Sequence, residues 1–229
     1  MFFNINYLIY MIPAFILMAA TSWYVKSAYN KWSQVRSRSG YTGAQAAQRL
    51  ISSAGLNGVQ VQVIGGEMTD NYDPRSKVLN LSQGVAGESS VAALAIAAHE
   101  LGHAMQDSED YLPLRLRSAL VPAVNIGSNL GWVLIMIGLF IGITQLAWLG
   151  VMVFGLGAIF SLATLPVEFD ASARAKRMLA DSGLISGDEI GGVSNVLNAA
   201  ALTYVAALVT SVMQLLYYVS LVSGGRRRD

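Results

Sequence analysis

The pentapeptide His99-Glu100-Leu101-Gly102-His103 combines residue types and a spacing that suit metal-dependent hydrolysis. Two residues four positions apart on an α-helix lie about 40° apart around its axis, so both imidazoles can bind one tetrahedral zinc ion. Glu100 follows the first histidine directly, and we expect it to act as the general base that removes a proton from a zinc-activated water. The motif therefore predicts that His99 and His103 are metal ligands and that Glu100 is catalytic.

The alternative interpretation is that both histidines are structural residues of a core helix. The chain has two histidines in all, and both lie in this motif, behind an apolar run that is typical of a helix. A buried glutamate beside them would be costly without a metal ion or another partner. These observations favour a zinc site.

The third protein ligand can be narrowed by elimination. The chain has no cysteine and no third histidine, so a carboxylate remains among the usual zinc ligands. Glu168 is the best candidate because it stands where a long apolar stretch ends, and Asp170 is its alternative. On a helix these two side chains would point about 200° apart, so one of them and not both should reach the metal. Three further carboxylates are expected at a solvated helix end: Asp107, Glu109 and Asp110.

The elements that would position these residues are mainly helices. Residues 91–105 are rich in alanine and predict the helix that carries the motif. Upstream, Thr42 and Gln45 form a capping-box pattern for a short helix, which Gly55 would end. Alternating segments at 58–65 and 76–82, with a turn cluster at 70–74 between them, predict a β-hairpin or a small sheet.

Composition indicates that much of the chain lies in a membrane. Hydrophobic residues make up 54% and charged residues 13% of the 229 residues, whereas soluble proteins carry about 25% charged residues. Three apolar regions predict four spans: residues 7–24, residues 118–167 with a turn at 142–145, and residues 196–222. A cleaved signal peptide is the alternative for the first region, but no Lys or Arg precedes it. Six glycines of the long region would permit close helix packing in lipid: Gly127, Gly131, Gly138, Gly150, Gly155 and Gly157.

These features divide the chain into five segments. They are an N-terminal transmembrane anchor (1–25), a polar zinc-protease segment (26–117), a transmembrane helical hairpin (118–167), a third-ligand helix with a polar segment (168–195), and a C-terminal transmembrane or membrane-associated helix with a basic tail (196–229). The hairpin crosses an even number of times and therefore returns Glu168 to the side of the histidines. Lys and Arg residues next to the spans indicate that this side is the cytoplasm, although the basic tail at 226–228 departs from that rule if the last helix crosses.

With these motifs and spans, the sequence resembles the YugP-type membrane zinc metallopeptidases over nearly its whole length. The resemblance is carried by the anchor and by three segments: Asp73–Ser82, Ala97–Gln106 and Leu165–Ser172. It implies a neutral zinc peptidase of the gluzincin type, with Glu168 as the third ligand.

The chain is more distantly similar to the HtpX-like and CAAX-protease membrane enzymes. Those enzymes carry a Glu-x-x-x-Asp pattern, whose aspartate steadies a histidine ligand. Here Glu168 fits the first position but Ser172 stands in the last, so Asp170 and Ser172 are the candidates for that hydrogen bond. In such enzymes a strand beside the active-site helix pairs with the substrate, and residues 77–82 could do so. An ordinary sheet strand is the alternative.

The expected protein is mainly α-helical and crosses the membrane several times, with a gluzincin-like zinc-protease core and a small β-hairpin or sheet. Its expected function is that of a zinc metalloendopeptidase with Zn²⁺ as cofactor, acting on peptide or protein substrates, membrane proteins among them. We expect it in a bacterial cell membrane, with the active site on the cytoplasmic side. Tyr72 and Tyr111 are candidates for the donor that stabilises the oxyanion, with packing as the alternative role for each.

Two other classes of function compete with this expectation. A catalytically silent membrane scaffold could keep the motif for folding, but a structural metal site needs no base such as Glu100. A transporter or channel subunit would need ionisable residues along its spans, and residues 118–167 contain none. The net charge of +1 provides no basic field for nucleic acid.

Overall fold

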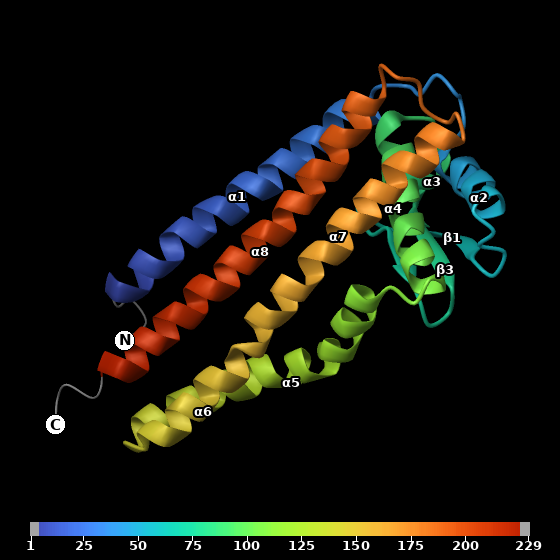
Figure 1. Ribbon diagram of the computed structural model, residues 1–229. Helices are drawn as coiled ribbons and strands as arrows, with labels where there is room; N and C mark the ends of the chain where they lie inside the picture. Colours follow the sequence, from blue (N-terminus) through green and yellow to red (C-terminus); the bar gives the residue numbers. More distant parts are fainter. Residues whose placement is uncertain (1–4, 225–229) are drawn as a thin grey trace. The chain divides into compact units, whose positions relative to one another are not determined.

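The computed structural model describes residues 5–224, which form eight α-helices and a three-stranded sheet (Figure 1). The helices are α1 (Ile5–Ser33), α2 (Gly43–Ser53), α3 (Gln83–Gly87), α4 (Val91–Ser108), α5 (Leu112–Phe140), α6 (Thr144–Phe154), α7 (Leu156–Asp181) and α8 (Ile190–Gly224). The strands are β1 (Gln60–Ile64), β2 (Asn71–Asp73) and β3 (Val78–Ser82). The predicted basic tail at 226–228 lies outside the described residues.

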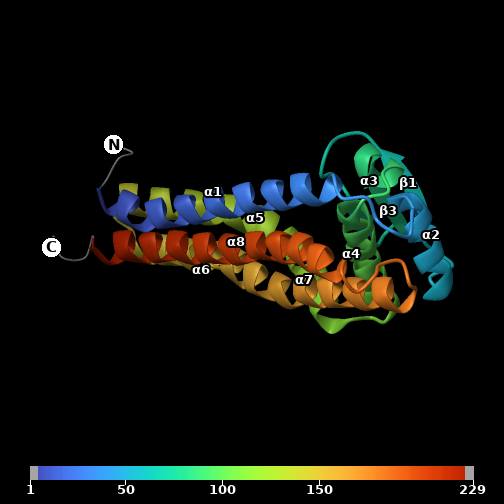
Figure 2. The ribbon, with the colours of Figure 1, turned by 90° about the horizontal axis from the view of Figure 1, so that it is seen from above.

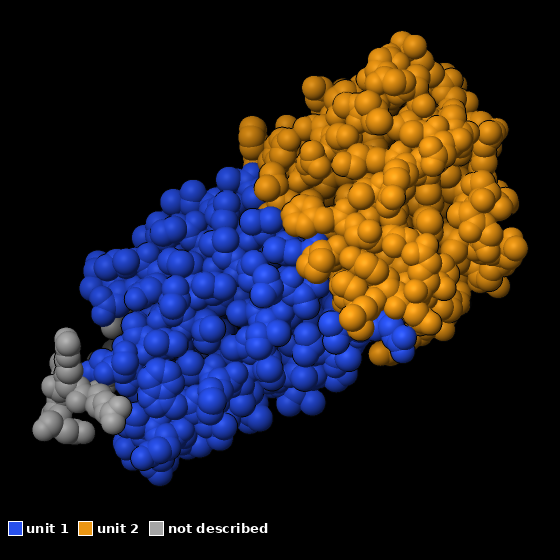
Figure 3. Space-filling view, viewed as in Figure 1, with its two compact units in different colours: residues 1–21, 115–165, 203–229 blue, residues 22–114, 166–202 orange. Residues whose placement is uncertain are grey.

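The chain divides into two compact units, which Figure 3 shows in blue and orange. The described parts of unit 1 are residues 5–21, 115–165 and 203–224. Unit 2 consists of residues 22–114 and 166–202. Both polar segments that the sequence indicates therefore contribute to one unit.

Within residues 5–224, four stretches are long and apolar enough to cross a membrane, which agrees with the predicted number. They are Ile5–Ser33, Leu112–Phe140, Thr144–Asp181 and Ile190–Gly224. The predicted turn in the long apolar region is also present, since α5 ends at Phe140, Gly142 has a φ of +76°, and α6 begins at Thr144. The third stretch combines α6 and α7, which Gly155 separates.

Unit 1 contains helix contacts that need glycine, as the sequence predicts. A Cβ atom at Gly131 would lie 2.7 Å from the backbone nitrogen of Phe154, and one at Gly150 would lie 2.6 Å from that of Ile135. No side chain fits at these positions without moving the neighbouring backbone. The two glycines therefore let α5 pack closely against α6.

The sheet of unit 2 has the strand order β1-β3-β2. β1 and β3 are the two predicted strands, but they run parallel, so they do not form a hairpin. The predicted turn cluster at 70–74 is wrong in part, because Asn71–Asp73 forms β2 and pairs antiparallel with β3. The turn follows instead, where the Asp73 carboxylate accepts hydrogen bonds from the backbone N–H of Arg75 and the hydroxyl of Ser76.

This sheet order changes the interpretation of residues 77–82. β3 pairs with β1 along its whole length and with β2 at Val78–Asn80, so most of its two edges is already used. A substrate cannot add to a central strand, because the backbone groups that would bind it are paired. Any substrate pairing must therefore use an outer strand, and β3 itself is an ordinary sheet strand.

Helix α4 lies at the centre of unit 2, with α2 and the strands next to it (Figures 1 and 2). It begins at Ser90, whose hydroxyl accepts a hydrogen bond from the N–H of Ala93. Alanines cover much of its surface and are buried, which brings its neighbours close. The predicted capping box of α2 is present, because Thr42 and Gln45 each accept from the other's backbone N–H.

Candidate metal centre

His99 and His103 occupy one face of α4, one turn apart. Their ring centroids are 4.9 Å apart, and the ring planes are inclined at 82°. Each side chain is 12% exposed, so a small part of each ring remains accessible. The two imidazoles can therefore reach a common point beside the helix.

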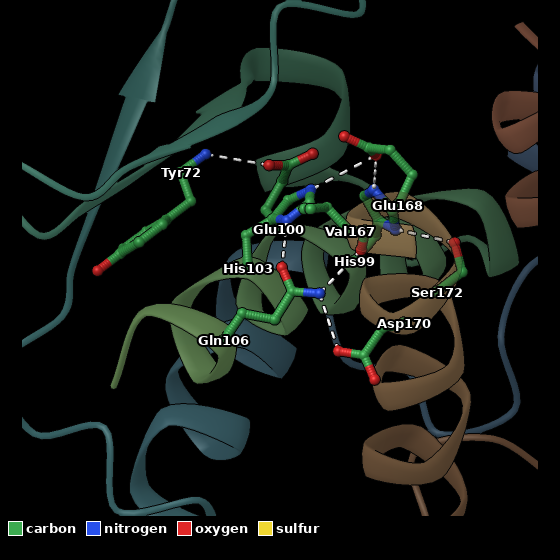
Figure 4. Close-up of polar contacts among 9 residues, drawn as sticks. All are labelled: Tyr72, His99, Glu100, His103, Gln106, Val167, Glu168, Asp170 and Ser172. Carbon is green, nitrogen blue, oxygen red and sulfur yellow. Dashed lines mark hydrogen bonds and ion pairs between the residues drawn. The ribbon is translucent and has the colours of Figure 1, made fainter. Parts of the chain in front are cut away.

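Helix α7 brings Glu168 to the same point, although Glu168 lies far from the histidines in the sequence (Figure 4). Its carboxylate Oε2 lies 3.3 Å from Nε2 of His99 and 3.6 Å from Nε2 of His103. The side chain is only 2% exposed. One potential ligand atom from each of these three residues lies within 4.8 Å of the others.

Close packing of α7 on α4 requires a glycine in the motif itself. A Cβ atom at Gly102 would lie 2.5 Å from the carbonyl oxygen of Ala171. Gly102 therefore lets the backbone of α7 pass directly over α4. The sequence did not identify this role for the residue.

The donor set and its spacing fit zinc. Ligand atoms about 2.0–2.2 Å from a tetrahedral ion lie roughly 3.3–3.6 Å from one another. The two distances from Glu168 to the histidine nitrogens are close to this separation. Two imidazoles and one carboxylate also match the protein ligands of a catalytic zinc site that keeps one position open.

Glu100 follows His99 on α4, but its side chain takes a different direction (Figure 4). Its Oε2 accepts a hydrogen bond of 3.0 Å from the backbone N–H of Tyr72 in β2. Burial raises the pKa of the Glu100 carboxyl group, while the two histidines act in the opposite direction. The residue thus stands beside the candidate ligands as a partly buried carboxyl group with a raised pKa.

Each histidine has a hydrogen-bond partner at its other ring nitrogen. Nδ1 of His99 lies 3.2 Å from the hydroxyl of Ser172. Nδ1 of His103 lies 3.0 Å from Oε1 of Gln106, whose amide nitrogen donates to Asp170 over 2.9 Å. Both sequence candidates for this supporting role are therefore near a histidine, Ser172 directly and Asp170 through Gln106.

Gln106 is a second residue near the site whose role the sequence interpretation missed. It is fully buried and follows His103 by three residues, a spacing that places it on the same helix face. This spacing was the available signal. The sequence does not show that Asp170, the second partner of Gln106, lies next to it, because Asp170 belongs to another helix.

The two tyrosines considered for the oxyanion have other partners. The hydroxyl of Tyr72 donates to Asp107 over 2.7 Å and lies at the end of the ring that points away from the histidines (Figure 4). The ring of Tyr111 packs against the guanidinium of Arg174 at 5.7 Å. In β2 it is the backbone N–H of Tyr72, and not its hydroxyl, that faces the site.

Burial and charge act in opposite directions on His103. Burial lowers the pKa of its imidazole, but the nearby carboxylates of Glu168 and Glu100 outweigh this, so the pKa lies above its ordinary value. Without a metal ion, this pair of carboxylates therefore favours a proton on the ring. A metal ion at the same point would have to displace that proton.

Comparison with known proteins gives a consistent result. The family model described as "Putative neutral zinc metallopeptidase" matches residues 7–223. The chain is also 43% identical over 202 residues to "Putative membrane protease YugP" of Bacillus subtilis (strain 168), which corresponds to 88% of this chain and 90% of that protein. No solved structure matches the chain.

Proposed function

Because the chain belongs to this family of neutral zinc metallopeptidases, we propose that it is a membrane zinc endopeptidase that binds its metal through His99, His103 and Glu168. Glu100 would be its catalytic base. The best support is that one potential ligand atom from each of these three residues lies within 4.8 Å of the others, next to the partly buried carboxyl group of Glu100.

The residues around the site suit hydrolysis of a peptide bond. A zinc ion held by the three ligands supplies a Lewis acid, which lowers the pKa of water to about 7 and polarises the scissile carbonyl group. Glu100 takes the proton from the attacking water and later gives it to the leaving amine. Burial raises the pKa of this carboxyl group, which brings its basicity closer to that needed near neutral pH.

We assign substrate binding to the open edge of β2. The N–H of Tyr72 donates to Glu100 and not to β3, so it lies on the outer side of the strand. Among the described residues no strand pairs with that side. An extended peptide that adds to this edge would bring its backbone next to Glu100. This favours unfolded segments of peptides or proteins as substrates, including polar segments of membrane proteins.

The active site would face the cytoplasm of a bacterial cell. Unit 2 contains the site and both polar segments. Lys26, Lys31 and Arg177, which stand near the ends of the spans, belong to the same unit, whereas Arg115 and Arg117 begin the segment 115–165 of unit 1. This distribution supports a cytoplasmic position by the positive-inside rule.

The proposal can be tested with purified protein in detergent and an unstructured fluorogenic protein as substrate. Glu100→Gln should keep zinc and lose hydrolysis, because the amide preserves the shape but cannot accept a proton. His99→Ala should lose both the metal and the activity. A chelator should abolish the activity of the unchanged protein, and added zinc should restore it.

Full activity of Glu100→Gln would remove this residue from the mechanism. Metal binding by the unchanged protein without any hydrolysis would support the silent scaffold instead. A third variant, Glu88→Gln, serves as the matched control, since Glu88 lies outside the site at the end of α3. It should behave as the unchanged protein does.

A further inference from the structure

We propose that Gln106 is a positioning residue that fixes the tautomer of His103, and that Asp170 and Arg174 hold its amide in the required orientation. The proposal rests on the assignment of His103 as a metal ligand. It assigns a role in the site to Gln106, which the sequence analysis does not predict.

The orientation of the Gln106 amide follows from its two acceptors. The side chain is fully buried, and its Nε2 lies 2.8 Å from the carbonyl oxygen of Val167 and 2.9 Å from Oδ2 of Asp170. A carbonyl oxygen and an ionised carboxylate can only accept. The amide nitrogen must therefore face them, which turns Oε1 towards His103.

This orientation determines which nitrogen of His103 carries the proton. Oε1 of Gln106 can only accept a hydrogen bond, and it lies 3.0 Å from Nδ1 of the imidazole. Nδ1 must then be the donor, so in the neutral ring the lone pair lies on Nε2. That nitrogen is the one that faces Glu168, where the metal would bind. Gln106 thus prepares His103 as an Nε2 ligand.

Asp170 is in turn held as an acceptor. Its Oδ2 accepts from Nε of Arg174 over 2.5 Å, and another nitrogen of this guanidinium donates to Glu109 over 2.7 Å. The Arg174 side chain is 12% exposed, so this ion pair is largely shielded from water. These contacts run from α4 to α7 and back, and they end at the exposed side chain of Glu109, which follows the last residue of α4.

His99 provides the internal comparison. Its partner at Nδ1 is the hydroxyl of Ser172, which can either donate or accept. A hydroxyl therefore does not fix the tautomer as the amide oxygen does. Gln106 and Ser172 should each affect their own histidine, so two variants can be compared within one protein.

The experiment uses the full chain labelled with ¹⁵N-histidine, in which the two histidines give two separate imidazole systems. In metal-free protein at alkaline pH, ¹⁵N shifts should show His103 as a single Nδ1–H tautomer. Gln106→Met has a similar length but no hydrogen bond, and it should produce a mixture of tautomers at His103. Zinc affinity, measured by competition with a chelator, should fall about 10–100-fold. Ser172→Ala should change the signals of His99 only.

A paired replacement tests the orientation of the amide. Gln106→Glu alone should also weaken zinc binding, because it sets a second carboxylate against Asp170. Adding Asp170→Asn supplies a donor in place of that acceptor, and the double variant should recover much of the affinity and the Nδ1–H tautomer. This comparison remains informative if Gln106→Met fails to fold.

Unchanged tautomer and unchanged zinc affinity in Gln106→Met would overturn the proposal, as would a double variant no better than Gln106→Glu alone. Failure of the underlying metal site is a separate result. In that case His103→Ala would bind zinc as tightly as the unchanged protein, whatever the state of Gln106.

Discussion

Of all single substitutions, replacement of Glu168 best distinguishes a residue that binds the metal from residues that only lie near it. Its Oε2 lies 3.3 and 3.6 Å from the two histidine nitrogens, whereas Asp170 is linked to His103 only through Gln106. A protein zinc site contributes about 10–16 kcal/mol of binding free energy, so removal of one of three protein ligands should cost on the order of 3–5 kcal/mol. Glu168→Ala should therefore weaken zinc binding about 10²–10⁴-fold.

Asp170→Ala should weaken binding less, by about 10–100-fold, because it acts on the orientation of a ligand and not on the metal. Glu109→Ala is the matched control at the end of the same set of contacts. Its side chain is 52% exposed, and an ion pair this close to solvent contributes little, so zinc affinity should stay within about twofold.

The affinities can be measured by titration of metal-loaded protein with a chelator at one pH. Far-UV circular dichroism of the metal-free variants shows whether the helices are retained. The reasoning would be refuted if Asp170→Ala lost the metal while Glu168→Ala kept it. The ligands would then be His99, His103 and Asp170.

Three further predictions follow from other features. The zinc affinity should fall as the pH falls, and the decrease should begin above the ordinary histidine pKa of about 6.5, because protons compete earlier for an imidazole with a raised pKa, as His103 has. Chelator titration at several pH values measures this, and an affinity that is constant down to pH 5 would contradict it. Gly102→Ala should lower the free energy of unfolding by about 1–3 kcal/mol and weaken zinc binding, because the new methyl group would overlap with the backbone of α7. Thermal unfolding measures the first effect, and chelator titration measures the second. Single cysteines at the exposed positions Ser52 and Gly187 should react with an impermeant maleimide from the same side of the membrane, and labelling from opposite sides would contradict the even number of crossings.

Features that depend on neighbours in the sequence were predictable. The capping box of α2 needs only Thr42 and Gln45, and the spacing of His99 and His103 is set by one turn of helix. The turn at Gly142 was also readable, because a long uncharged stretch must break somewhere and glycine permits a positive φ.

Features that depend on partners far along the chain were not predictable. β2 has three residues, too few for an alternating pattern, and it exists because β3 offers it an edge. The partner of Gln106 is Asp170, 64 residues away on α7. The local sequence of α4 or of α7 does not predict that these two helices are in contact, because the contact depends on the packing of Gly102 against Ala171.

The two histidines and Glu168 stand on either side of the whole apolar stretch 118–167. During translation the histidines therefore leave the ribosome before this stretch, and Glu168 leaves it afterwards. A chain that stopped before α7 would carry the complete pentapeptide motif and still lack one of the three ligand groups. The three ligand groups can meet only after the intervening stretch has been synthesised, so metal loading cannot begin before this apolar part of the protein has been made.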